Sequence, residues 1–294
     1  MSDQNGPILV IGATGQQGSG AVRELLDRGR AVHAFVRDTD ASAAKTLREA
    51  GAELIVGDLD DPASLRAAMR GVHGVFLVLT MLEGRKVTAG GIAAEARRGR
   101  SVVDIARESS VGHLVYSSVS GADRDTGIPY YANKLMIEQY IAEVAVPATI
   151  LRPFFFMDNF TTLTRPVLGD GEVVLSLALR PETRLPLIAT RDIGAFAAIA
   201  FEHPDRFLGR TLKIAGDELS AAEMAEAFGR VTGLPARFQQ LPIEHVRAFD
   251  EQVAKSFEWF DQGAVQAPDF AELRAEHPGL MTLDSYLRTT GWRP

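Results

Sequence analysis

Cysteine is absent from this chain of 294 residues, so disulfide bonds, thiolate nucleophiles and thiolate metal ligands are all excluded. Long hydrophobic runs are absent as well, since no segment reaches the ~18 apolar residues that a membrane-spanning helix needs. The N-terminal residues 1–5 lack the charged and apolar regions of a signal peptide. We therefore expect a cytoplasmic protein without a membrane partner.

Basic residues are in the minority. Lys and Arg together number 31 against 38 Asp and Glu, which gives a formal net charge of -7. A nucleic-acid-binding surface needs a basic face that neutralises phosphates, so this balance argues against nucleic acid as a partner. A local basic pocket for a few phosphates stays compatible with it, because net charge does not describe a single cleft.

Several catalytic patterns are also missing. The six histidines have no spacing that suits a metal site, so we expect no bound metal. The G-x-S-x-G turn of α/β-hydrolases does not occur, and neither does the G-x-x-x-x-G-K loop of nucleotide hydrolases. These absences disfavour an α/β-hydrolase and a nucleotide hydrolase of the phosphate-loop type.

Short apolar strands alternate with amphipathic helices over about the first half of the chain. The predicted strands span residues 8–11, 32–36, 54–56, 75–79, 114–116 and 148–151. The predicted helices span 18–28, 41–50, 62–69, a long stretch ending near 109, and 131–144. Parallel neighbours need helical crossovers, so this order predicts an α/β fold: a Rossmann-type doubly wound parallel sheet with a ligand crevice at the carboxyl ends of its strands.

The second half of the chain is less regular. It contains a predicted strand over 211–214 and a predicted helix over 221–232 that ends at Gly233, and the rest reads as helix and loop. We expect a larger domain over 1–153 and a smaller C-terminal α+β domain over 154–294, with some exchange of chain between the two.

A glycine-rich loop follows the first predicted strand and precedes a helix. It reads Gly12-Ala13-Thr14-Gly15-Gln16-Gln17-Gly18, with the spacing G-x-x-G-x-x-G. Glycines allow a tight turn and let backbone N–H groups approach a pyrophosphate, and the helix N-terminus adds partial positive charge. The domain 1–153 is therefore expected to bind a nicotinamide dinucleotide, NAD(P), through these residues.

The end of the second predicted strand bears on the choice of cofactor. Arg37 lies 37 − 18 = 19 positions after the last glycine of the loop, where the group that reads the adenine ribose is expected. A guanidinium pairs bidentately with phosphate, so Arg37 favours NADP(H). NAD(H) stays the less favoured alternative, because Asp38 adds a negative charge next to Arg37.

After the third strand, Asp58 and Leu59 are placed at the adenine, and either Asp60 or Asp61 caps the next helix.

With these features the chain resembles the NmrA-like family of atypical short-chain dehydrogenases/reductases, and is similar to its NADPH-binding redox sensor proteins. Further matching stretches are Val115-Tyr116-Ser117, Lys134 with Glu138 and Tyr140, Arg152 followed by Asp158-Asn159, and Thr282-Leu283-Asp284. The resemblance implies a cleft between a cofactor domain and a small C-terminal domain. It also implies that Leu79, Thr80 and Met81 border the cofactor, that Lys134 lies by the nicotinamide ribose, and that Phe156, Met157, Asp158 and Asn159 lie by the nicotinamide.

Tyr130 and Lys134 have the Y-x-x-x-K spacing of short-chain dehydrogenases. Four residues apart on a helix, the two side chains share one face. In that chemistry the Tyr hydroxyl exchanges a proton with the substrate oxygen, and the Lys ammonium assists it and binds the cofactor ribose. A third member, a serine, has three candidates: Ser117, Ser118 and Ser120. Tyr130 and Lys134 are thus the candidate catalytic residues.

Three functions stay open. The first is an NADP(H)-dependent oxidoreductase acting on a small apolar carbonyl, quinone or enone, with an apolar pocket lined by aromatics that have core packing as their alternative role. These aromatics are Phe154, Phe155, Phe156, Phe257, Trp259 and Phe260. The second is a non-catalytic sensor of the NADPH/NADP+ ratio that acts through a regulatory protein partner. The third, weaker function is an NAD-linked isomerase or epimerase. A homodimer is expected only from the resemblance.

Overall fold

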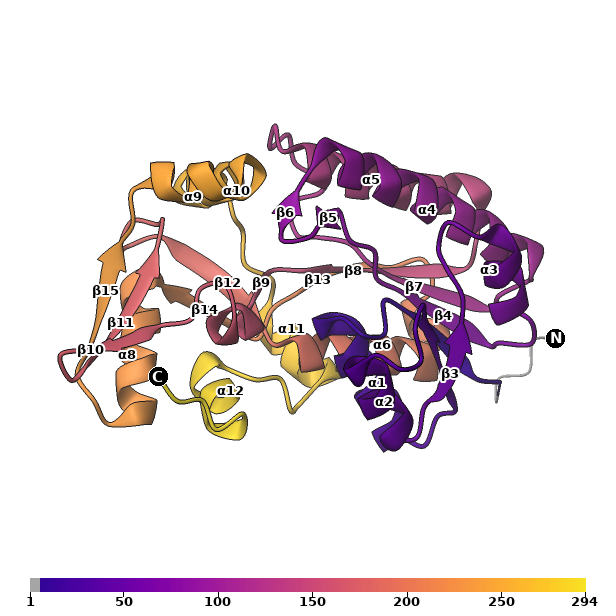
Figure 1. The fold of residues 1–294 in the computed structure, drawn as a ribbon, viewed down its shortest axis with the longest axis horizontal. Helices are drawn as coiled ribbons and strands as arrows, with labels where there is room; N and C mark the ends of the chain where they lie inside the picture. Colours follow the sequence, from indigo (N-terminus) through magenta and orange to yellow (C-terminus); the bar gives the residue numbers. More distant parts are fainter. Residues whose placement is uncertain (1–5) are drawn as a thin grey trace. The chain divides into compact units, whose positions relative to one another are not determined.

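The computed structural model describes residues 6–294 (Figure 1). They divide into two compact units. The first takes in the chain up to Asp125 together with Pro129–Arg152 and Ile193–Leu212, and the second takes in Thr126–Ile128, Pro153–Asp192 and Lys213–Pro294. Residues 1–5, whose sequence is unlike a signal peptide, lie outside the described part of the chain.

A seven-stranded sheet forms the centre of the first unit. Its strands are β1 (Ile8–Ile11), β2 (Val32–Val36), β3 (Glu53–Val56), β4 (Gly74–Leu77), β7 (His113–Ser117), β8 (Ala148–Pro153) and β13 (Thr211–Ile214). The strand order is β13-β8-β7-β4-β1-β2-β3, and the pairs from β3 to β8 are all parallel. The order reverses direction at β1 and β4, which is where such sheets bind ligands. The predicted doubly wound α/β fold is confirmed, with β13 as a further strand.

Helices cover both faces of this sheet. They are α1 (Gln16–Asp27), α2 (Ser42–Glu49), α3 (Pro62–Ala68), α4 (Ala89–Glu108), α5 (Pro129–Val144), α6 (Thr190–Glu202) and α7 (Pro204–Phe207). Figure 1 shows α3, α4 and α5 on one face and α1, α2 and α6 on the other. The sheet is apolar on both sides because both are covered, and Leu9, Ile11, Leu77 and Leu114 are fully buried under the first of these layers.

Local capping chemistry sets several of the helix starts. The Asp61 carboxylate accepts a hydrogen bond from the Ala63 N–H at 2.9 Å, with Pro62 in the first turn. Asp61, rather than Asp60, is therefore the cap of α3. Asp60 instead pairs with Arg98 of α4.

The second unit contains two three-stranded sheets. Their strands are β9 (Phe155–Phe156), β10 (Val167–Gly169), β11 (Glu172–Leu177), β12 (Arg184–Ile188), β14 (Asp217–Ser220) and β15 (Ala236–Gln240). The helical segments of this part of the chain are η1 (Met157–Thr161), α8 (Ala221–Thr232), α9 (Ile243–Phe249), α10 (Glu251–Asp261), α11 (Phe270–Glu276) and α12 (Leu283–Thr289). Helix α8 begins at a capping box of Ser220 and Glu223 and ends at Gly233, whose φ is +74°. Its predicted bounds are confirmed.

Aromatic side chains form much of the core of the second unit. The Phe228 ring packs edge-on against Phe160 and at a tilt against Trp292, with ring centroids 5.3 Å and 4.6 Å apart. Phe257 and Trp259 are only 6% and 7% exposed, and both rings contact Phe260. For the aromatics of α10, core packing is therefore the role that the structure supports.

Among residues 6–294, no helix combines the length and the apolar character needed to cross a membrane.

Candidate cofactor site

The glycine loop is closed so tightly that two of its positions admit no side chain. Gly12 has a φ of +81°, and a Cβ there would lie 2.7 Å from the carbonyl oxygen of Val78. A Cβ at Gly18 would lie 2.1 Å from the carbonyl oxygen of Gly12. The loop thus turns from β1 into α1 with its backbone pressed against the end of β4, as a close approach to a phosphate group requires.

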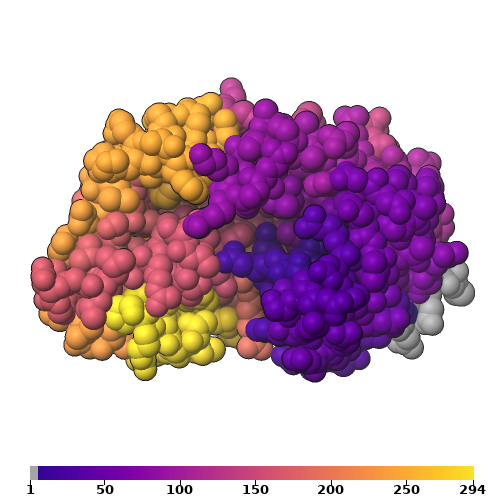
Figure 2. Space-filling view, in the orientation of Figure 1, coloured from indigo at the N-terminus to yellow at the C-terminus, as the bar shows by residue number. Residues whose placement is uncertain are grey.

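The N-terminus of α1 carries no group that competes for an anion. Its N-cap residue, Gly15, has no capping side chain, and no acidic residue occupies the first turn. The first N–H groups of a helix have no partner within the helix, and the helix dipole adds positive charge there. Thr14, Gly15 and Gln16 are exposed, and the space-filling view in Figure 2 shows the N-terminal segment of the first unit, in indigo, reaching the surface. The backbone N–H groups therefore stay available for a pyrophosphate.

A side-chain hydrogen bond ties the start of α1 to the end of β7. The Ser117 hydroxyl donates to Gln17 Oε1 at 2.6 Å, across 100 positions of sequence. The bond commits the Gln17 carbonyl and leaves its amide group as a donor. It also fixes a side chain of the glycine loop beside the strand that precedes the candidate catalytic segment.

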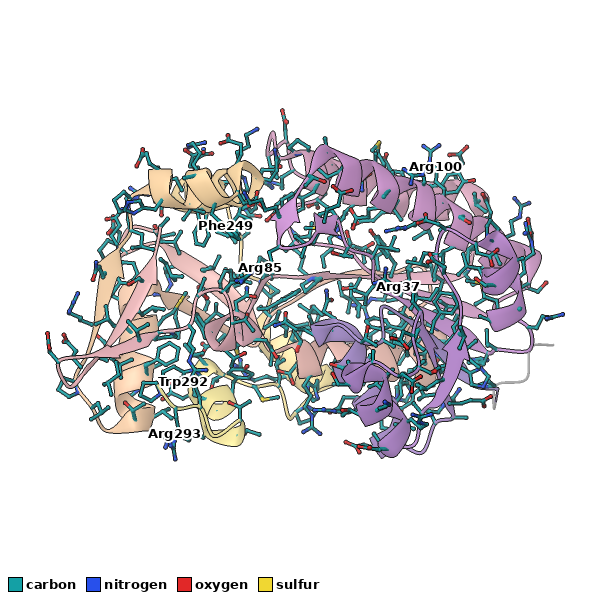
Figure 3. All side chains as sticks on the ribbon, viewed as in Figure 1. Arg37, Arg85, Arg100, Phe249, Trp292 and Arg293 are labelled. Carbon is teal, nitrogen blue, oxygen red and sulfur yellow. The ribbon has the colours of Figure 1, made fainter. Side chains whose placement is uncertain are left out.

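Arg37 stands at the carboxyl end of β2, next to the glycine loop that follows β1, because the two strands are parallel neighbours. Its side chain is exposed and has no hydrogen-bond or ion-pair partner among the residues that the structure describes (Figure 3). The nearby acids are already engaged: Asp38 accepts from the backbone N–H of Asp40 at 2.8 Å, and Asp40 pairs with Lys45 at 3.4 Å. The guanidinium is thus free to bind a phosphate.

Asp58 and Leu59 follow β3 along the same edge of the sheet. The exposed Asp58 carboxylate accepts from the Asp60 N–H at 2.9 Å, and its own N–H donates to the Ser64 hydroxyl at 3.0 Å. Leu59 packs against the core of the unit. These contacts hold the turn in one conformation and leave Asp58 facing solvent.

The segment Leu79-Thr80-Met81 follows β4, the strand next to β1. Leu79 is buried, whereas Thr80 is exposed and its hydroxyl oxygen accepts from the Leu82 N–H at 3.1 Å. A Cβ at Gly91 would lie 2.1 Å from the Met81 carbonyl oxygen, so α4 begins in direct contact with this segment. The first unit therefore brings together, at one edge of its sheet, the predicted segments that follow β1 to β4.

Lys134 is buried on α5 and forms an ion pair that the sequence did not reveal. Its Nζ lies 2.9 Å from Oε1 of Glu95 on α4, and the Asn133 amide donates to Glu95 Oε2 at 2.7 Å. Tyr130, one turn earlier on α5, is half-buried, and its ring packs edge-on against Tyr131 with centroids 4.8 Å apart. Glu95 was missed because it lies 39 positions from its partner and its own helix shows only an ordinary amphipathic pattern.

Two of the three candidate serines have their hydroxyls engaged. Ser117 donates to Gln17, and Ser118 donates to the Glu138 carboxylate. Glu138 is held in turn by Arg152, whose Nη2 lies 2.6 Å from Glu138 Oε2. Burial lowers the pKa of Arg152, but the hydrogen bond and the charge of Glu138, together with those of Asp123, outweigh it and leave the pKa raised. Ser120 is buried as well.

The match to a family model extends over nearly the whole chain. The model of the NmrA-like family matches residues 4–287. This chain belongs to the NmrA-like family.

Curated relatives and solved structures resemble this NmrA-like chain along most of its length. An NAD(P)H azoreductase of Xenophilus azovorans is 29% identical over 241 residues, which cover 82% of this chain and 79% of that relative. NmrA, a negative transcriptional regulator, has been solved with NAD, with a TM-score of 0.81 and 21% identity over 99% of each chain, and also with NADP. An NADPH-dependent quinone oxidoreductase of Escherichia coli, solved with NADPH, gives a TM-score of 0.78 at 20% identity, covering 97% of this chain and 100% of that one. The structural likenesses establish the shared fold.

The other predicted cofactor residues of this NmrA-like chain belong to the second unit. Met157 is fully buried in its core, and Phe156 and Asn159 are half-buried. Both carboxylate oxygens of Asp158 accept from Thr190, from its N–H at 2.8 Å and from its hydroxyl at 2.7 Å. Asp158 therefore holds the first residue of α6.

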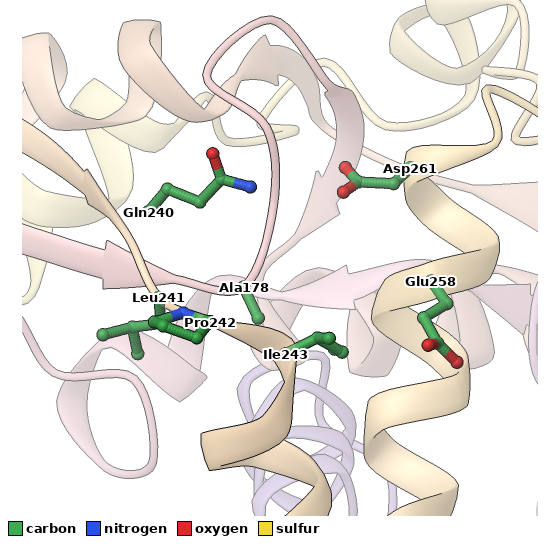
Figure 4. Close-up of a pocket in the computed structure, with 7 residues that line it drawn as sticks. All are labelled: Ala178, Gln240, Leu241, Pro242, Ile243, Glu258 and Asp261. Carbon is green, nitrogen blue, oxygen red and sulfur yellow. The ribbon is translucent and has the colours of Figure 1, made fainter.

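The second unit also has an open cavity of about 450 Å³ between β15 and α10 (Figure 4). Its walls are Ala178, Gln240, Leu241, Pro242, Ile243, Glu258 and Asp261. The two carboxylates are already engaged, Glu258 by Arg247 and Asp261 by Thr183 and the Arg180 N–H. The cavity is therefore an apolar recess with compensated charges. Over residues 6–294, no three His, Cys, Asp or Glu side chains group in a way that suits a metal ion.

Proposed function

We propose that this NmrA-like chain binds NADP(H) in its first unit and reduces a small apolar carbonyl, quinone or enone with it. The observation that carries the proposal is the uncapped N-terminus of α1 beside an unpartnered Arg37. The residues present fit the cofactor. Gly12 and Gly18 close a turn that a Cβ would obstruct, the start of α1 has free N–H groups, and the Arg37 guanidinium suits a 2′-phosphate. NADP(H) is favoured over NAD(H) on this ground.

Each element of the site would have one role. The N–H groups of the glycine loop would hold the pyrophosphate, Arg37 the 2′-phosphate, and Asp58 the adenine amino group. Lys134 would bind the nicotinamide ribose. When bound in its reduced form, the cofactor supplies a hydride. Tyr130 would donate the proton that the substrate oxygen takes up, so that one hydride and one proton together reduce the carbonyl to an alcohol.

Relatives support the reductase assignment in general terms. The azoreductase and the quinone oxidoreductase named above are both oxidoreductases by their names, and both names specify a nicotinamide cofactor. The substrate class of this chain rests on the proposal alone.

A second candidate function is a regulator that senses the NADPH/NADP+ ratio through a protein partner. Two observations favour it. The Lys134 ammonium is compensated by Glu95, and the hydroxyls of Ser117 and Ser118 are engaged within the protein. NmrA itself is named a transcriptional regulator and has been solved with NAD and with NADP.

One experiment separates these functions. The protein is titrated with NADPH and NADH by calorimetry, and absorbance at 340 nm is then followed against a panel of quinones, enones and aryl ketones. Tighter binding of NADPH with steady oxidation is the expected result. NADPH binding without turnover on any substrate would favour the regulator, and failure to bind either cofactor would overturn both candidates.

A further inference from the structure

Glu95 is the most deeply buried acid in the neighbourhood of the candidate site. Its exposure is 0%, and both of its carboxylate oxygens are used, one by Lys134 and one by the Asn133 amide. A buried carboxylate without a cation is strongly destabilising. The fold therefore keeps Glu95 and Lys134 together as a unit.

Other charged groups near Lys134 do not replace Glu95. Glu138, one turn further along α5, is held by Arg152 and Ser118. The ring of Tyr116 lies 5.8 Å from Lys134 Nζ, and its hydroxyl has no hydrogen-bond partner among the described residues. Burial, followed by the charges of Glu95 and Glu138, raises the pKa of Tyr116 far above its ordinary range, so that its phenol stays neutral. Glu95 is thus the carboxylate that compensates Lys134.

Close packing of α4 on α5 brings the pair within reach. A Cβ at Gly99 would lie 2.8 Å from Ile137 Cδ1, so the missing side chain at this position lets the two helices approach. Glu95 lies one turn before Gly99 on α4, and Lys134 lies one turn before Ile137 on α5. The contact between the helices therefore determines where the lysine side chain is held.

A lysine side chain has four rotatable bonds and loses most of its rotamer entropy when it is fixed in one conformation. On its own, such a chain samples many positions for its ammonium group. A fixed anion selects one of them, and the Asn133 amide fixes that anion in turn. Two of the three ammonium N–H bonds remain for other acceptors after the bond to Glu95.

We propose that Glu95 is a positioning residue that holds the Lys134 ammonium in place for the ribose of the cofactor. This role rests on the proposed NADP(H) binding. It assigns to α4 a function in the site that no motif of the sequence indicates.

The test is a double-mutant cycle read by NADPH affinity. Wild type, Glu95→Gln, Lys134→Met and the double variant are titrated with NADPH by calorimetry. Lys134→Met should weaken binding about tenfold, as for the loss of a charge-assisted hydrogen bond. Glu95→Gln should weaken it about fivefold, and the double variant should match Lys134→Met rather than reach the roughly fiftyfold product.

Asp104→Asn is the matched control. Asp104 also lies on α4 and also contacts α5, accepting a hydrogen bond from the Tyr140 hydroxyl at 2.6 Å. The substitution removes a carboxylate charge from the same pair of helices without touching Lys134, so NADPH affinity should stay at the wild-type value. Glu95→Asp, which keeps the charge on a shorter side chain, serves if Glu95→Gln does not fold, and should weaken NADPH binding by a smaller factor.

A second readout needs no cofactor. The chain has five lysines, namely Lys45, Lys86, Lys134, Lys213 and Lys255, so a ¹⁵N-lysine spectrum of the ammonium groups is sparse. In the cofactor-free protein, the buried Lys134 ammonium should give a slowly exchanging signal that is missing in Lys134→Met. The signal should shift or broaden away in Glu95→Gln and persist in Asp104→Asn.

Each outcome separates this inference from the proposed function. If wild type binds NADPH and Lys134→Met binds it equally well, the positioning role is wrong while NADP(H) binding stands. Additive losses in the cycle, or a Lys134 signal that Glu95→Gln leaves unchanged, overturn the inference in the same way. If wild type does not bind NADPH, both proposals fail together.

Discussion

A Cβ placed on Gly18 would lie 2.1 Å from the carbonyl oxygen of Gly12, a distance at which backbone atoms must move. A Cβ on Gly15, the middle glycine of the same loop, would lie 3.4 Å from that oxygen, close to ordinary contact. The three glycines are therefore unequal. The first and last close the turn, and the middle one leaves the helix N-terminus uncovered.

We expect Gly18→Ala to lower the free energy of unfolding by about 3 kcal/mol or more, because the overpacked contact is with backbone. Gly15→Ala should cost less than about 1 kcal/mol, the ordinary cost at an N-cap. Urea denaturation of the two variants checks the difference. Equal losses of unfolding free energy in the two variants would mean that the close contact between Gly18 and Gly12 does not determine the stability of the loop.

Arg37→Gln should weaken NADPH binding by about ten- to a hundredfold, since it removes a charge-assisted contact to the 2′-phosphate. NADH lacks that phosphate, so its affinity should change less than about twofold. Lys45→Gln is the control, because Lys45 belongs to the same segment and already pairs with Asp40. Parallel calorimetric titrations with both cofactors give the result, and an equal loss for NADH would remove Arg37 from the phosphate site.

Tyr130→Phe should lower turnover by at least about a hundredfold, because the general acid is lost. Cofactor affinity should stay nearly unchanged. Tyr140→Phe provides a comparison on the same helix, since that hydroxyl donates to Asp104 instead. Steady-state assays at 340 nm on the best substrate of the panel measure both variants, and full activity in Tyr130→Phe would require another proton donor.

The free energy of unfolding should decrease as the pH is lowered, because the buried His113 is held in its neutral form in the folded protein. Burial, with the nearby His73, lowers the pKa of His113 from 6.5 to about 4. The Thr149 hydroxyl donates a hydrogen bond to the Phe207 carbonyl oxygen, so it accepts one from His113 Nε2. The neutral ring therefore carries its proton on Nε2. Its Nδ1 is unprotonated and has no hydrogen-bond partner in the described chain.

Below pH 6.5 the unfolded chain takes up a proton at this position that the folded chain resists until about pH 4. The free energy of unfolding should therefore decline across this window, by about 3 kcal/mol at most from this residue. Denaturation curves of wild type and His113→Gln between pH 7 and 4 isolate the contribution, since the variant should lack it. The exposed His245, changed in the same way, should leave the slope unaltered.

Asp158→Ala should lower the free energy of unfolding by about 1–2 kcal/mol, because both of its oxygens hold Thr190 at the start of α6. Asn159→Ala is the neighbouring control, since its side chain has no hydrogen-bond partner among residues 6–294. Thermal or urea unfolding compares the two. An unchanged stability in Asp158→Ala, with weaker NADPH binding, would assign the carboxylate to the cofactor instead.

The sequence by itself determined the parallel sheet and the glycine loop. Both follow from short-range patterns. Apolar residues recur every two to four positions in the strands and helices, and the glycine loop directly follows one strand and precedes one helix. Helix ends were readable for the same reason, as Gly233 and the acids before Pro62 show. The predicted strand over residues 32–36 also placed Arg37 directly after its carboxyl end.

The sheets of the second unit could not be predicted from the sequence, because several of their strands are short and pair with strands far away in the sequence. β9 has two residues and pairs with β12, some thirty positions later, and β12 also pairs with β14. Such segments carry no periodicity long enough to tell a strand from a loop. Their hydrogen bonds exist only once the chain has folded.

Tertiary structure alone decided which side chains meet. Lys134 and Tyr130 share a helix, and their spacing was visible, yet the partner of the Lys134 ammonium is Glu95 on a different helix. Ser117 could be named as a candidate, but its bond joins it to Gln17, 100 positions away in the sequence. A buried charge takes whichever opposite charge the packing of helices brings within about 3 Å, and that packing depends on contacts such as Gly99 against Ile137 that no local pattern records.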